Sequence, residues 1–114
     1  MIKYTLIFTA TIILSACGET KLLPVTQADV DRGATKYPGT TLESLNDGKA
    51  DFQHYCTQCH GLKNPAKKTA DQWLKIVPGM TEKAARSATK EKIDLKKKES
   101  ILRYLVTMSK TASK

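Results

Sequence analysis

Beyond residue 40, hydrophobic residues recur every three or four positions, which is the spacing of helices that bury one face. The first such stretch opens with Thr40 and Glu43, a capping-box pattern in which each residue's side chain satisfies a backbone amide of the other. Its helically spaced residues are Leu45, Gly48, Phe52, Tyr55 and Cys56. The pattern therefore predicts a helix that starts at this capping box and reaches Cys56.

Two further helices are predicted downstream. One begins at a second capping box, formed by Thr69 and Gln72, and we expect Pro78-Gly79 to break or kink it. The other begins after Asp94. Their apolar residues are Trp73, Ile76 and Val77 in the former and Leu95, Ile101, Leu102, Leu105 and Met108 in the latter. No segment alternates apolar and polar residues over the length of a strand, so the sequence predicts an all-α domain.

The stretch before residue 40 has no sustained periodicity and holds two prolines and two glycines between positions 24 and 39. We expect residues 17–39 to be a tether that becomes ordered near the domain, with a short helical turn at 29–36. The folded domain is then expected to span 40–114.

Residues 1–16 have the pattern of an export signal, with Lys3 followed by an apolar run from Tyr4 to Leu14. This run is shorter than the roughly 20 residues that a membrane-spanning helix needs. We therefore expect a signal peptide that is removed.

Leu14-Ser15-Ala16-Cys17 at the end of this signal resembles the bacterial lipobox. The resemblance implies that Cys17 is acylated and becomes the first residue of a chain anchored to a membrane on its periplasmic side. Gly18, which stands where some sorting signals have Asp, slightly favours the outer membrane. The alternative is an ordinary cleavage site with a chance or buried cysteine.

Composition limits the size and the core of the domain. The chain has 114 residues with 6 Gly and 4 Pro, which excludes collagen-like and low-complexity classes and allows one compact domain at most. After residue 17 the aromatic side chains are Phe52, Trp73, Tyr37, Tyr55 and Tyr104. A large covalently held cofactor would supplement so thin a core.

Cys56-Thr57-Gln58-Cys59-His60 has the spacing C-x-x-C-H, the attachment sequence of c-type haem. One helical turn places both sulfurs on the same side, where they can form thioethers with the haem vinyl groups. The adjacent His60 then reaches the iron as its proximal ligand.

Three other readings of this motif are weaker. A thioredoxin-like C-x-x-C follows a strand, whereas a helical pattern precedes Cys56. A zinc site would need His54 with Cys56, Cys59 and His60, crowded on one segment. A disulfide between the two cysteines would close a very small loop and leave His60 unexplained.

Residues 40–110 resemble a small class I bacterial cytochrome c, and the resemblance extends beyond the haem motif. The spacing of Gly48, Phe52 and Cys56 is that of the family's first helix. The spacing of Ile101, Tyr104 and Leu105 is that of its last helix. The resemblance implies a cytochrome c-like fold with three to four short helices around a covalently bound haem, in which Tyr104 crosses over Gly48 and Phe52.

The family's distal iron ligand is usually a methionine downstream of the motif. The segment from Trp73 through Val77 to Met80 resembles the tryptophan–valine–methionine arrangement of short monohaem cytochromes, which implies Met80 as the ligand. Met108 belongs to the apolar face of the last helix and is interpreted as core. A lysine ligand and an open site are the alternatives. Because Met80 follows His60 by only 20 positions, we expect one haem edge to be exposed.

Two residues between these ligands have less specific interpretations. The Pro65 carbonyl is a candidate acceptor for the second ring nitrogen of His60, a contact that orients iron-bound imidazoles. A simple turn residue is the alternative. Trp73 is expected to pack on the haem edge, to bind a propionate through its indole N–H, or only to fill the core.

The chain carries 19 Lys and Arg against 11 Asp and Glu, a net charge of +8 at pH 7. Basic residues gather at Lys63, Lys67, Lys68, Lys83, Arg86, Lys90, Lys92, Lys96, Lys97 and Lys98. They are interpreted either as a solvated surface or as a surface that steers redox proteins with acidic docking sites. Anionic lipid near the anchor is a further possible partner. Nucleic acid is not expected as a partner of an exported lipoprotein.

The sequence therefore predicts an electron carrier rather than an enzyme: a membrane-tethered cytochrome with one haem c that cycles between Fe(II) and Fe(III). One alternative is a haem protein with an open distal site, acting as a gas sensor or a weak peroxidase. Another is a cytochrome subunit of a larger oxidoreductase.

Overall fold

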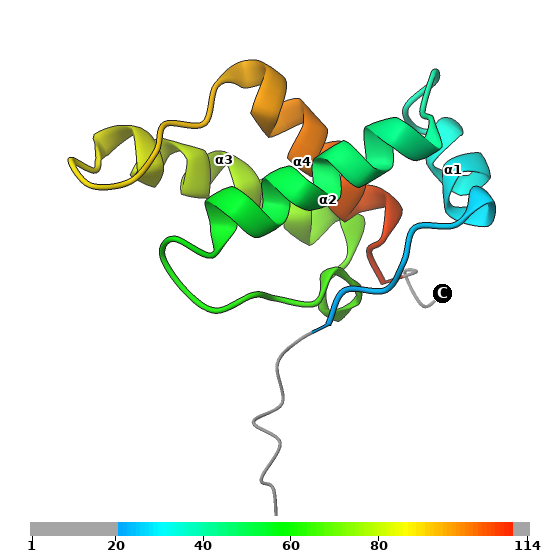
Figure 1. Cartoon of the computed structure of the whole chain (residues 1–114), viewed down its shortest axis with the longest axis horizontal. Coiled ribbons are helices and arrows are strands. Elements are labelled where there is room, and N and C mark those ends of the chain that lie inside the picture. Colours follow the sequence, from blue (N-terminus) through cyan, green and yellow to red (C-terminus); the bar gives the residue numbers. More distant parts are fainter. Residues whose placement is uncertain (1–20, 111–114) are drawn as a thin grey trace, which may run out of the picture.

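The computed structural model describes residues 21–110, and this part of the chain is helical. Its elements are α1 (Gln27–Ala34), α2 (Leu42–Cys56), the short 3-10 helix η1 (Pro65–Lys67), α3 (Ala70–Arg86) and α4 (Leu95–Thr107). The three longer helices form the body, and α1 lies at one end of it (Figure 1). The all-α prediction is confirmed for these residues. No helix within 21–110 has the length and apolar character needed to cross a bilayer.

The helix starts agree with the predicted capping boxes, with one correction. Thr69 and Gln72 cap α3 as predicted, and Asp94 caps α4. At α2, however, the cap is Thr41 with Ser44, one residue later than the predicted pair. Thr40 cannot serve as the cap because its side chain turns inward, where its hydroxyl donates to the carbonyl of Tyr37 at 2.5 Å.

Pro78-Gly79 was expected to break or kink the helix, but it does not break it: α3 runs from Ala70 to Arg86 as one helix. A proline inside a helix removes one backbone hydrogen bond and crowds the preceding turn. Apolar residues on both sides of Pro78 nevertheless face the same way, with Val77 and Ala84 both buried. Their common packing favours continuation of the helix.

Gly48 is the point of closest approach between α2 and α4. A Cβ at this position would collide with the backbone carbonyl of Ser100 and lie 2.7 Å from the Cβ of Tyr104. One turn further along α2, the Phe52 ring lies 5.9 Å from that of Tyr104. The predicted crossing of Tyr104 over Gly48 and Phe52 is therefore confirmed.

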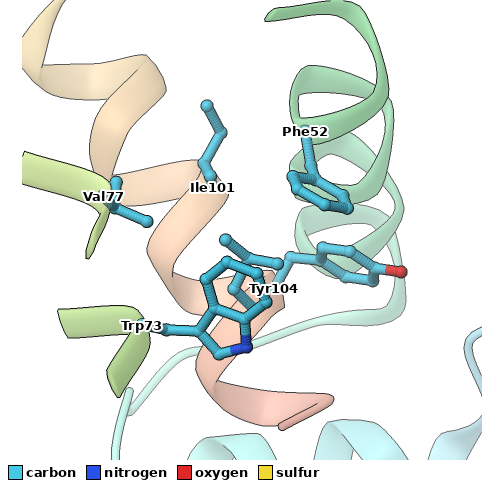
Figure 2. Close-up of a cluster of buried hydrophobic side chains, with 6 residues drawn as sticks. Phe52, Trp73, Val77, Ile101 and Tyr104 are labelled. Atoms are coloured by element: carbon cyan, nitrogen blue, oxygen red, sulfur yellow. The ribbon is translucent and has the colours of Figure 1, made fainter. Parts of the chain in front are cut away.

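The main core lies where α2, α3 and α4 meet. Figure 2 shows the Phe52 ring of α2 directed toward Tyr104 of α4 and Trp73 of α3, and Val77 and Ile101 belong to the same buried cluster. Leu105 completes this buried cluster. The packing joins all three long helices through a few large side chains.

The helix α1 lies inside the segment that was expected to be a tether, near its predicted helical turn. The Arg32 guanidinium donates to the Thr107 carbonyl at the end of α4, with distances of 3.2 Å from Nε and 3.0 Å from Nη2. Asp29 binds the same guanidinium at 2.6 Å and accepts from the backbone amide of Thr26 at 2.8 Å. These contacts attach α1 to the body.

We expect Gly48→Ala to lower the free energy of unfolding by about 1–3 kcal/mol, because the added methyl group overpacks the α2–α4 contact. Gly79→Ala is the matched control, since a Cβ on this helical glycine would meet no surrounding atom within 4 Å. The control should raise stability by about 0.4–1 kcal/mol. Denaturant unfolding followed by circular dichroism measures both values, and equal stabilities would contradict the close approach.

Asp29 gives the stability a pH dependence. Burial raises the pKa of Asp29, but hydrogen bonds from Thr26 and Arg32 outweigh it and hold the pKa below its ordinary value of 3.8. Because the folded-state pKa is depressed, the stabilisation is present above pH 3.8 and disappears as the pH falls through the folded pKa. Asp29→Asn should therefore cost about 1–2 kcal/mol at pH 7 and progressively less below pH 4, as measured by urea unfolding. A cost independent of pH would contradict this assignment.

Candidate functional site

The C-x-x-C-H motif lies where α2 ends. Cys56 is the last residue of the helix and is partly buried, whereas Cys59 is exposed in the following turn. Both are free thiols, so the alternative of a disulfide between them is not realised. Burial, with a smaller contribution from the neighbouring Cys59, raises the pKa of Cys56 to about 11. Its sulfur is therefore a protonated thiol at neutral pH.

The partly buried His60 has one ring nitrogen engaged and the other available. Its Nδ1 lies 2.7 Å from the carbonyl oxygen of Gly61. A carbonyl oxygen can only accept, so Nδ1 is the donor and carries the proton. In the neutral imidazole the lone pair is then on Nε2, which is the state of a histidine prepared to bind a metal.

Met80 comes from a different helix and meets His60 at two neighbouring cavities of about 130 Å³ each. Cys56, His60 and Met80 line both cavities, and Cys59 lines the second. The structure thus brings two thiols, an imidazole and a thioether, from the end of α2 and the middle of α3, around one hollow region.

The walls of this region are largely apolar. The apolar residues of the first cavity are Phe52, Trp73, Ile76, Val77 and Leu105. Those of the second are Tyr55, Ala84 and Ile93. Such walls favour an apolar occupant over water.

The loop of residues 87–94 supplies Ile93 and is fastened to α2 through Glu91. The backbone amide of Glu91 donates to the Gln58 side chain at 3.1 Å. Its carboxylate lies 2.9 Å from Nε2 of His54. Sequence reasoning did not find this connection, because the bonded residues are 33 and 37 positions apart and no local pattern marks them.

Lysines are the charged side chains at these cavities. Lys63 and Lys68 line the first, Lys83 lines the second, and no acidic side chain among the described residues lines either. All three belong to the basic residues noted in the sequence, but the sequence did not indicate that they would lie beside the cavities.

Pro65 and Trp73 are partners of each other. The indole N–H of Trp73 donates to the Pro65 carbonyl at 2.9 Å, and both residues are buried. His60 uses the Gly61 carbonyl at the nitrogen for which Pro65 was a candidate. The Trp73 ring also packs edge-on against Phe52, with centroids 6.2 Å apart. The loop after the motif is thereby connected to the start of α3.

Two other candidate ligands lie away from the cavities. His54, which a zinc site would have required, is exposed and paired with Glu91, as expected for a surface histidine. Between residues 21 and 110, no three His, Cys, Asp or Glu side chains form a group able to hold a metal ion. Met108 packs against the core beside α1, with its sulfur 4.0 Å from Nη2 of Arg32. The predicted signal of residues 1–16 and Cys17 lie outside the described residues.

Comparison of the chain with protein-family models, curated proteins and solved structures finds no match.

Trp73→Phe should reveal the contribution of the indole hydrogen bond. The phenyl ring preserves much of the apolar contact but removes the indole donor from the Pro65 carbonyl, which keeps only the backbone amide of Lys68 at 3.3 Å. The loss of this one hydrogen bond should cost about 0.5–1.5 kcal/mol of stability. Denaturant unfolding measures the change. A neutral substitution would show that this hydrogen bond does not hold the loop.

Proposed function

We propose that this chain is an electron-carrying cytochrome with a single haem c, tethered to a membrane on its periplasmic side by acyl chains on Cys17. The observation that carries the proposal is the convergence of Cys56, His60 and Met80 on the same two apolar cavities. Residues with these chemical groups, drawn from the end of α2, the turn after it and α3, are the set that a covalently held iron porphyrin needs.

Each residue has a distinct role in this proposal. Cys56 and Cys59 would hold the porphyrin through thioether bonds, and Nε2 of His60 and the Met80 sulfur would bind the iron. Bound haem supplies one-electron chemistry, with the iron alternating between Fe(II) and Fe(III). The protein orients the group and keeps water from it.

The residues fit such a group. The hydrogen bond from Nδ1 of His60 to Gly61 leaves Nε2 free to coordinate. A porphyrin supplies four nitrogens to its iron, so two protein ligands complete the coordination. A cluster of three or more His, Cys, Asp or Glu side chains is therefore unnecessary for this metal.

The other side chains at the cavities favour electron transfer over peroxidase chemistry. His60 is the one histidine among the lining residues, which include neither an arginine nor an acid. No second histidine, arginine or acid is therefore positioned there as a distal acid–base group. Lys63, Lys68 and Lys83 instead give the rim a positive charge that would attract the acidic docking surface of a redox partner.

The test is the optical spectrum of the haem-loaded soluble domain that begins after Cys17, recorded in both oxidation states. We expect a low-spin ferric spectrum with the weak far-red band of iron–thioether ligation. Met80→Ala should abolish this band and open the iron to cyanide or carbon monoxide, because no second thioether lines the cavities.

Met108→Ala is the matched control, since Met108 lines neither cavity, and it should retain the band. A wild-type spectrum that is high-spin and shifts with cyanide or carbon monoxide would replace electron carriage with the sensor or peroxidase alternative. Failure to attach haem covalently would overturn both.

A further inference from the structure

We propose that residues 21–34 are a docked segment that holds the haem-binding domain close to the membrane, so that its electron-transfer partners are proteins of the same membrane. This inference rests on the proposed lipid anchor at Cys17. In Figure 1 the segment runs along the body as an extended chain and continues into α1.

The extended part of the docked segment is attached to the core. Leu22 and Val25 pack against the buried cluster that joins α2, α3 and α4. The Leu23 side chain between them is 74% exposed, and its carbonyl accepts from Nζ of Lys49 on α2 at 3.2 Å. Leu22 and Val25 thus face the body, whereas Leu23 and Pro24 between them are exposed, as in a chain lying on a surface.

The helical part is attached to the end of α4. Val30 is 7% exposed, and a Cβ on Gly33 would lie 2.7 Å from Oγ1 of Thr107, so the α1 backbone lies in close contact with the Thr107 side chain. Arg32 adds its two donations to the Thr107 carbonyl. Together these contacts leave little of the expected tether free.

The number of residues between Cys17 and the docked segment limits how far the domain can lie from the bilayer. Leu22 is the fifth residue after Cys17, and an extended chain spans at most about 3.6 Å per residue, which limits this stretch to about 18 Å. A tether free up to residue 39 would extend to about 80 Å by the same measure. Docking therefore confines the domain to a thin layer at the bilayer.

This confinement selects the class of partner. A haem held in that layer meets electron-exchange sites that lie near the same bilayer far more often than sites carried by the opposite membrane or by large soluble complexes. The effective concentration of such membrane-bound partners rises as the free span shortens.

The experiment uses the full-length, lipidated, haem-loaded protein in phosphatidylcholine vesicles that carry a headgroup fluorophore. Haem quenches the fluorophore according to its distance from the bilayer. A 20-residue Gly–Ser spacer between Gly18 and Glu19 lengthens the free span without touching the fold.

If the segment is docked, the spacer raises the root-mean-square free span from about 12 Å to about 28 Å, and quenching falls sharply. If residues 17–39 are already free, the same spacer raises it only from about 26 Å to about 36 Å. A small change in quenching would therefore overturn the proposal. Electron exchange between oxidised and reduced vesicle populations should rise several-fold with the spacer, and an unchanged rate would contradict the limit on reach.

A second variant detaches the segment by Leu22→Ser, Val25→Ser and Val30→Ser. It should lose quenching as the spacer variant does, and its α1 amides should lose protection from hydrogen exchange. Leu23→Ser is the matched control, because this exposed side chain contributes no packing, and it should behave as the wild type.

Failure of the proposed function remains distinguishable. Protein without covalent haem absorbance, or protein that does not sediment with the vesicles, would contradict the haem or the anchor. Haem-loaded, vesicle-bound protein with unprotected α1 amides would overturn docking alone.

Discussion

The contact between α2 and α4 at Gly48 is the constraint on which the rest of the structure depends. The absence of a side chain there lets the Ser100 carbonyl and the Tyr104 Cβ approach the α2 backbone. This approach sets Phe52 against Tyr104, and Phe52 in turn receives the edge of Trp73 from α3. One glycine thus determines how closely two helices cross and where the third one packs.

The candidate site is a direct extension of that core. Cys56 lies one turn beyond Phe52, so the orientation of α2 that buries the phenyl ring also brings the cysteine to the cavities. On α3, the Trp73 ring packs against Phe52 and lines the first cavity. Its hydrogen bond to the Pro65 carbonyl fixes the loop that leads away from His60. The groups proposed to hold haem are therefore placed by the same few contacts that hold the helices together.

Local signals in the sequence were enough for much of the fold. The capping residues Thr69 and Asp94 determine helix starts within one turn, and the three-to-four-residue period locates the buried faces. The hydrogen bonds from Arg32 to the Thr107 carbonyl join residues 75 positions apart, and no short sequence pattern predicts them. The sequence predicted only a short helical turn at 29–36 and did not identify the Thr26–Asp29 capping box of α1. The attachment of α1 to α4 depends on a surface that exists only after α2 and α4 have packed.

The continuity of α3 through Pro78 shows why the orientation of Met80 could not be predicted from local sequence alone. Met80 lies three residues after Val77 and four before Ala84, so an unbroken helix puts its thioether on the same face as these two buried side chains. If the helix had ended at Pro78, Met80 would lie in a loop, and its side chain would no longer be fixed on the same face as Val77 and Ala84. Proline chemistry argued locally for such a break, whereas the apolar face shared by both halves of α3 favours one helix. The packing that outweighs the local cost of Pro78 is also what directs Met80 toward His60.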